Sequence, residues 1–66
     1  MYIYEKKIYT YAVEKKNKVS EYYDEIRKEI QFPKGNKIYK NGYEIDLNKT
    51  FKENYIINNM RLEIGK

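Results

Sequence analysis

The chain has 66 residues, a net charge of +4, and no histidine, cysteine or tryptophan. It therefore lacks the side chains of the usual zinc sites, of disulfides and of Ser-His or Cys-His nucleophile systems, so no catalytic residue, cofactor site or metal ligand is assigned. A chain of about 60 residues buries only about 60% of its unfolded surface, so residues 1–66 are expected to form one small domain with one modest core.

The N-terminal part of the chain is rich in residues that favour strands. Tyr2-Ile3-Tyr4 and residues 8–13 both have this composition, and Glu5-Lys6-Lys7 separates them. The spacer is compatible with a tight turn between two strands or with a bulge inside one long strand. No signal peptide or membrane-length apolar run is present, so the chain is expected to be cytoplasmic.

The central segment predicts one amphipathic helix over about residues 18–31. Its apolar residues recur at helical spacing, which indicates a stripe facing the core, and they are Val19, Tyr22, Tyr23, Ile26 and Ile30. Asn17 or Ser20 is expected to cap the start. Phe32-Pro33 is expected to end the helix, because the residue before a proline is disfavoured in the α region.

Asn41-Gly42 lies between two runs that favour strands and predicts a β-hairpin with a type I′ turn. That turn pairs Lys40 with Tyr43, Tyr39 with Glu44, and Ile38 with Ile45. Ile38, Tyr43, Ile45 and Leu47 are then expected to face the helix, whereas Lys37, Tyr39, Glu44 and Asp46 point to the other side. Pro33-Lys34-Gly35-Asn36-Lys37, just before this hairpin, is expected to be a plain connection.

The C-terminal third is more ambiguous. Tyr55-Ile56-Ile57 and residues 60–64 favour strands, with Asn58-Asn59 as a turn or as part of one strand. An alternative makes residues 49–57 a short helix capped by Asn48. We expect strands here.

These elements assemble into an α+β domain of two layers, with one helix packed on an antiparallel sheet of about four strands. The other face of the sheet would be open and would carry tyrosines and lysines. The candidate partner-binding residues are Tyr9, Tyr11, Lys37, Tyr39, Lys40 and Arg61. If Tyr9 and Tyr11 instead face the helix, Ile8 and Thr10 replace them on the open face, because neighbouring residues of a strand point to opposite sides.

The nine tyrosines admit two explanations. Tyrosine gives large, rigid contact area at protein interfaces. However, its codons, like those of the abundant lysine, isoleucine and asparagine, begin with A or T at both of their first two positions. An AT-rich genome would therefore enrich all four residues without selection for binding, and only the positions of the tyrosines distinguish the two.

The favoured function is a non-catalytic binding protein, an inhibitor or adaptor of the phage or mobile-element type, including anti-defence proteins, that contacts a larger host protein through a Tyr/Lys surface. The alternative is a nucleic-acid-binding module with an open basic sheet face. A remote alternative is a histidine-free ribonuclease that uses Arg27, Arg61 and a tyrosine. No membrane partner is expected. A homodimer is an alternative use of the open face, because a core this small often needs an additional source of stability such as oligomerisation.

Overall fold

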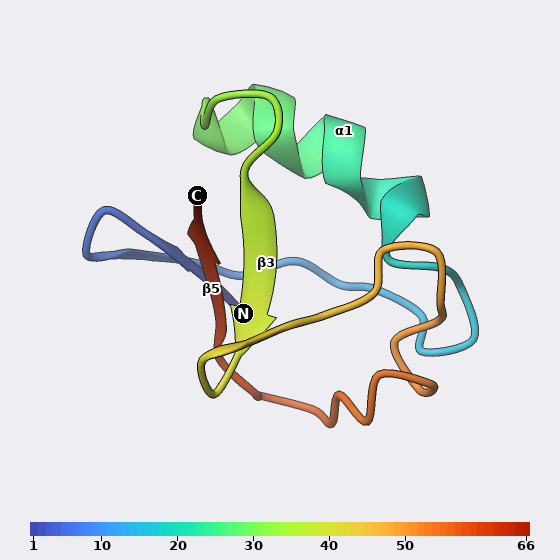
Figure 1. Ribbon diagram of the computed structural model, residues 1–66. Coiled ribbons are helices and arrows are strands. Elements are labelled where there is room, and N and C mark those ends of the chain that lie inside the picture. The colour runs from blue at the N-terminus through green and yellow to red at the C-terminus, as the bar shows by residue number, and fades with distance from the viewer.

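The computed structural model describes residues 1–66 as one helix packed on a five-stranded sheet (Figure 1). The elements are β1 (Tyr2–Tyr4), β2 (Lys7–Tyr9), α1 (Ser20–Ile30), β3 (Lys37–Lys40), β4 (Tyr43–Glu44) and β5 (Leu62–Gly65). The strands lie in the order β2-β1-β5-β3-β4. The predicted α+β arrangement of one helix on a sheet is therefore confirmed.

The sheet is mixed, whereas the sequence predicted antiparallel pairing throughout. Strands β1 and β5, from the two ends of the chain, run parallel at its centre, with Tyr2 opposite Leu62 and Ile3 opposite Glu63. The other three pairs of neighbouring strands are antiparallel. A parallel pair needs a long connection, and here the helix, the hairpin and the loop after it supply one.

The core lies between α1 and the inner face of the sheet. It is built from apolar residues of every layer, including the loops, which are Tyr2, Val19, Ile26, Ile30, Phe32, Ile38, Ile45, Phe51, Ile56, Leu62 and Ile64. Along β5 the buried Leu62 and Ile64 alternate with the exposed Glu63. That alternation shows that one face of the sheet is covered and the other faces solvent.

Helix α1 keeps the predicted apolar stripe but is shorter than expected at both ends. Neither Asn17 nor Ser20 caps it with a side chain. Its start is instead fastened by backbone bonds, in which the Val19 N–H donates to the Lys49 carbonyl at 3.1 Å and the Ser20 N–H donates to the Leu47 carbonyl at 2.9 Å. No helix in the structure is long and apolar enough to cross a membrane.

The end of α1 follows the prediction from Phe32-Pro33. Gln31 takes a left-handed conformation with φ of 66°, and its N–H donates to the Arg27 carbonyl at 2.7 Å. Phe32 then turns into the core, where its ring lies 5.5 Å from that of Tyr23.

The β3–β4 hairpin has the predicted turn and register. Asn41 and Gly42 have φ of 51° and 84°, as a type I′ turn requires, and Lys40 pairs with Tyr43. The prediction that Tyr43 packs toward the helix with Ile38 and Ile45 is wrong, since Tyr43 is 77% exposed. Strand β4 is only two residues long and lies at the edge of the sheet, so Tyr43 is on the inner side but beyond the reach of the core.

The N-terminal spacer is a tight turn. Strand β1 pairs with β2 so that Tyr2 lies opposite Tyr9 and Tyr4 opposite Lys7, which leaves Glu5 and Lys6 as a two-residue loop. Both have positive φ, 48° and 66°. Of the expected strand 8–13, only Ile8 and Tyr9 belong to the sheet, as part of β2, and the segment after them is irregular.

Residues 49–57 form neither a strand nor a helix, so the expected strand at Tyr55-Ile56-Ile57 is wrong. They form a series of turns that starts with a reciprocal cap. The Glu53 N–H donates to Thr50 Oγ1 and the Thr50 N–H donates to Glu53 Oε1, both at 2.9 Å. Thr50, rather than Asn48, is therefore the capping residue, as in a capping box.

Candidate functional site

The open face of the sheet carries one tyrosine rather than several. Ile3 lies beside Ile8 and beside Glu63, and Glu63 lies beside Tyr39. Lys37 on the same face approaches Glu44, with Nζ 3.5 Å from Oε1. Basic and acidic side chains therefore neutralise each other around a small apolar strip, and this face is less aromatic and less basic than expected.

Tyr9 and Tyr11 do not share this face. Tyr9 pairs with Tyr2 and so points to the inner side, and Tyr11 packs edge to face against Tyr2 with ring centroids 5.8 Å apart. The alternative with both tyrosines turned toward the helix side is the one that the structure contains, and Ile8, 56% exposed, takes their place.

The six predicted partner-binding residues therefore do not form a single surface. Lys37 and Tyr39 lie on the open face, where the Tyr39 hydroxyl donates to the Lys66 carbonyl. Lys40 lies on the other side of β3, and Arg61 is exposed just before β5. Of the ribonuclease candidates, Arg27 is half-buried on α1.

The most exposed aromatic side chains gather around Lys40. Tyr43 and Tyr55 are 77% and 80% exposed, more than any other large hydrophobic residue. Lys40 is paired with Tyr43, and its Nζ lies 5.6 Å from the centroid of the Tyr55 ring. We call Lys40, Tyr43 and Tyr55 the tyrosine patch; sequence reasoning identified only its lysine.

Asn54 holds the loop that carries Tyr55 against the hairpin. Its Oδ1 accepts from the Asp46 N–H at 2.9 Å, and its Nδ2 donates to the carbonyls of Asp46 and Thr50 at 2.9 and 3.0 Å. Its own carbonyl accepts from Lys40 Nζ at 3.0 Å. A hydrogen-bonded framework thus places the Lys40 ammonium group and the backbone of the loop that carries Tyr55, which has a positive φ of 58°. No motif in the sequence marks Asn54 for this role.

The carboxyl group of Glu53 is part of the same framework. Hydrogen bonds from the Thr50 backbone and side chain hold the pKa of Glu53 below its ordinary value, with help from the nearby positive charges of Lys49 and Lys18. The ionised carboxylate of Glu53 therefore accepts these hydrogen bonds more strongly than the protonated group would, and the reciprocal cap is most stable when Glu53 is charged.

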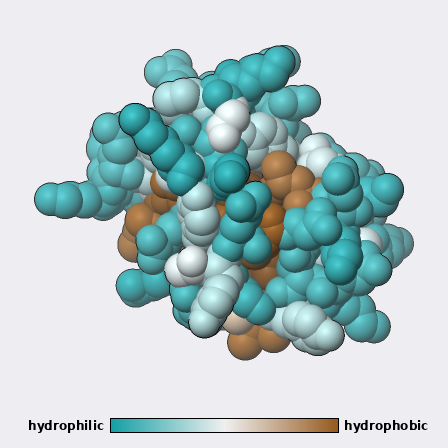
Figure 2. Space-filling view, in the orientation of Figure 1, coloured by the Kyte–Doolittle hydropathy of each residue, from teal (hydrophilic) through white to brown (hydrophobic).

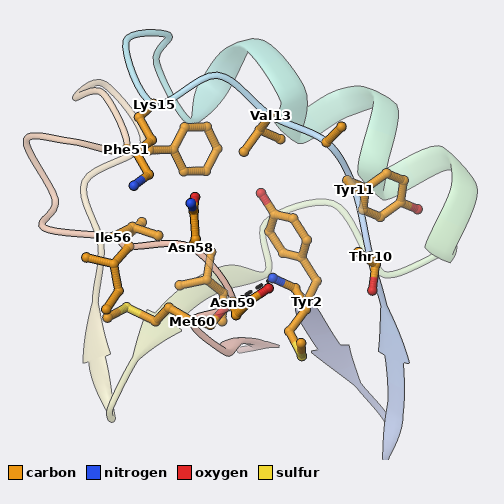
Figure 3. A pocket seen from close by; sticks show the side chains of 14 residues that line it. Tyr2, Thr10, Tyr11, Val13, Lys15, Phe51, Ile56, Asn58, Asn59 and Met60 are labelled. Atoms are coloured by element: carbon orange, nitrogen blue, oxygen red, sulfur yellow. Dashed lines mark hydrogen bonds between the residues drawn. The ribbon is translucent and has the colours of Figure 1, made fainter.

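A cavity of about 310 Å³ lies on another part of the molecule, between the N-terminal segment and the loop before β5 (Figure 3). Ten of the fourteen residues that line it are hydrophobic, and none is acidic. Figure 3 shows the Tyr2 ring reaching into this space, with the Asn58 amide directed toward the same interior. Tyr2 is 2% exposed, and its hydroxyl has no hydrogen-bond partner within the protein.

Burial raises the pKa of the Tyr2 hydroxyl, so this hydroxyl stays protonated. Burial also raises the pKa of Tyr11 to about 12, assisted by a hydrogen bond and the negative charge of Glu29. Sequence reasoning missed the cavity, because its walls come from irregular segments that no periodic pattern marks.

The face drawn in Figure 2 is mainly polar, with apolar surface reaching solvent in a few places. No cluster of three or more Asp or Glu side chains is arranged to hold a metal ion. No protein-family model matches the chain, and comparison with curated proteins and with solved structures likewise finds no match.

Proposed function

We propose that the protein is a non-catalytic binding protein that contacts a larger host protein through the tyrosine patch. The observation that carries this proposal is the exposure of Tyr43 and Tyr55, 77% and 80%, next to Lys40. Tyrosine supplies rigid, amphipathic area at small entropy cost and is enriched at interface hot spots. These two rings contribute little to the fold and are free to contact a partner.

The hydrogen bonds that fasten the Tyr55 loop to the hairpin also support a binding role. Asn54 ties the Tyr55 loop to Asp46 and Lys40 by bonds of 2.9 to 3.0 Å. A surface held in its bound shape loses less conformational entropy on association. Lys40 and the net charge of +4 favour a partner with carboxylates beside an apolar groove.

Size and composition support the biological class of the proposal. A 66-residue chain without histidine or cysteine suits an inhibitor or adaptor that covers a site on its target, as phages and other mobile elements encode against host defence. The absence of cysteine accords with action in the cytoplasm.

The test is affinity capture from a host lysate treated with nuclease, with bound proteins identified by mass spectrometry. The wild-type chain should retain one protein in stoichiometric amount, and the double variant Tyr43→Ser, Tyr55→Ser should lose it. Ile8→Ser is the matched control, because it removes an exposed apolar side chain from the open face instead. Equal capture by wild type and the double variant would reject the tyrosine patch as the contact surface.

A second candidate is binding of single-stranded nucleic acid, favoured by the same exposed rings beside Lys40. Bases stack on tyrosine faces, and lysines contact phosphates. Fluorescence anisotropy with labelled single-stranded RNA and DNA tests it, since binding should weaken steeply between about 50 and 200 mM salt. No binding at the lower salt concentration would exclude it.

If the protein forms a homodimer instead, the open face of the sheet is the surface through which the two copies would pack. Ile3, Ile8 and Tyr39 form its only apolar strip, flanked by the Lys37–Glu44 ion pair. Mass from light scattering across a concentration series distinguishes monomer from dimer, and a dimer that Ile8→Lys dissociates would assign the open face to self-association.

A further inference from the structure

We propose that the Asn41-Gly42 turn is a site of spontaneous deamidation, which converts Asn41 into aspartate or isoaspartate and alters the tyrosine patch. Asn41 and Gly42 connect Lys40 to Tyr43, two of the three patch residues. The reaction needs water as its only co-reactant, so it proceeds whether or not a partner protein is present.

The reaction begins when the Gly42 backbone nitrogen attacks Cγ of the Asn41 side chain. An N–Cγ bond forms, the Cγ–Nδ2 bond breaks, and ammonia leaves with the proton that the Gly42 nitrogen loses. The succinimide ring that results then takes up one water molecule. Hydrolysis at Cγ gives aspartate, whereas hydrolysis at the main-chain carbonyl of Asn41 gives isoaspartate, in which the main chain runs through the side-chain carbons.

Three features of the turn favour this attack. Glycine has no Cβ, so its backbone rotates freely and no side chain hinders the approach of its nitrogen. The Gly42 N–H donates no hydrogen bond within the protein, so none has to break first. Asn41 and Gly42 are both exposed, beside a two-residue strand at the edge of the sheet, so the turn has room to change shape and water reaches it.

The other asparagines lack this combination. Asn36 is only 8% exposed. In four cases the N–H group of the next residue already donates a hydrogen bond, namely after Asn17, Asn48, Asn54 and Asn59. Asn58 is exposed, as Asn41 is, but the residue after it carries a side chain. Asn58 is therefore the internal reference for the reactivity of Asn41.

Both products change the tyrosine patch. A carboxylate replaces a neutral amide next to Lys40, which lowers the net charge of +4 by one. Isoaspartate also lengthens the main chain of the loop, so a two-residue type I′ turn no longer fits between Lys40 and Tyr43. The position of Tyr43 relative to Lys40 therefore changes.

Incubation of the purified protein in a mildly alkaline buffer at physiological temperature tests the site. Peptide mass spectrometry follows the replacement of NH₂ by OH at each asparagine, and an isoaspartyl methyltransferase measures the isoaspartyl product. Asn41 should react at least about tenfold faster than Asn58. Reaction at Asn41 that is no faster than at Asn58 would overturn the proposal.

Two variants test the role of the Asn-Gly pair in its turn. Gly42→Ala adds a methyl group that meets no atom within 4 Å, and it should slow deamidation of Asn41 at least about tenfold. Glu5→Asn with Lys6→Gly places the same pair in the other two-residue turn, whose φ angles of 48° and 66° are similar. The new asparagine should react within about threefold of the rate at Asn41. Undiminished reaction in Gly42→Ala, or an inert new pair, would also overturn the proposal.

The isoaspartyl form, separated from wild type by ion exchange, tests the effect on the patch. It should melt roughly 4–8 °C below wild type. The amide signal of Tyr43 should shift in NMR spectra, while that of Ile8, on the opposite edge strand, should stay in place. An unchanged melting temperature together with an unchanged Tyr43 signal would refute the effect on the patch.

Discussion

Replacing Glu5-Lys6 with the Asn-Gly pair of the other hairpin should stabilise the protein. Glu5 and Lys6 have left-handed φ angles of 48° and 66°, close to the 51° and 84° of Asn41 and Gly42. A side-chain-bearing residue in this region costs roughly 1–2 kcal/mol. Glycine removes that cost, although its greater freedom in the unfolded chain takes back about 0.5–1 kcal/mol. Asparagine tolerates the conformation better than glutamate does.

The expected net gain of Glu5→Asn with Lys6→Gly is about 1–2 kcal/mol, or roughly 4–15 °C in the unfolding midpoint of a domain this small. Both side chains are exposed and neither forms an ion pair, so no contact is lost, and the net charge does not change. Urea and thermal denaturation followed by circular dichroism measure the gain, with an unchanged m-value. A variant no more stable than wild type would refute this reasoning.

The reciprocal change, Asn41→Glu with Gly42→Lys, is the matched control. No atom lies within 4 Å of the position that a Cβ on Gly42 would occupy, so the cost there is conformational and not steric. The unfolding midpoint of this variant should fall by about as much as the midpoint of the Glu5→Asn, Lys6→Gly variant rises. A fall at one turn without a rise at the other would show that the two turns are not equivalent.

Three further changes test other parts of the structure. Thr50→Ala removes one half of the reciprocal cap and should lower the unfolding midpoint by roughly 4–8 °C; an unchanged midpoint would show that the cap does not contribute. Phe51→Ala truncates a side chain that is 1% exposed and should cost about 3–5 kcal/mol, close to the whole net stability of so small a core, so circular dichroism should show a largely unfolded chain. Raising the pH should destabilise the fold, because the raised pKa values of Tyr2 and Tyr11 mean that the fold favours their neutral forms. Stability should hold below pH 10, the ordinary pKa, and be lost as the pH rises toward the pKa of Tyr11, about 12. Ultraviolet titration of tyrosinate checks this, and ionisation of all nine tyrosines near pH 10 would contradict it.

Local patterns predicted the helix and the Asn41-Gly42 hairpin because each depends on neighbouring residues. The apolar spacing from Val19 to Ile30 identifies one buried stripe, and the Asn-Gly turn dictates its own register. Turn chemistry did not identify the Glu5-Lys6 loop, since neither residue favours positive φ.

Features that depend on contacts between distant segments were not predictable in the same way. The parallel pairing of β1 with β5 joins the two ends of the chain, and no local signal encodes it. Tyr43 points to the inner side of the sheet, as the hairpin register predicts. It is nevertheless exposed, because β4 is a short strand at the edge of the sheet and the core does not extend that far. The tyrosine patch depends on the irregular loop that Asn54 fastens to Asp46 and Lys40. The cavity is lined by segments from both ends of the chain, which include Tyr11 and Asn58.

The proposed binding function is tested most directly by the affinity of the purified partner for wild type and for Tyr55→Ala. Tyr55 is 80% exposed, so its truncation should leave the melting temperature almost unchanged. We expect at least a thirtyfold loss of affinity by calorimetry, which corresponds to a hot spot of about 2 kcal/mol, and less than a threefold change for Ile8→Ser. Unchanged affinity in Tyr55→Ala together with a large loss in Ile8→Ser would contradict the proposal and move the contact surface to the open face of the sheet.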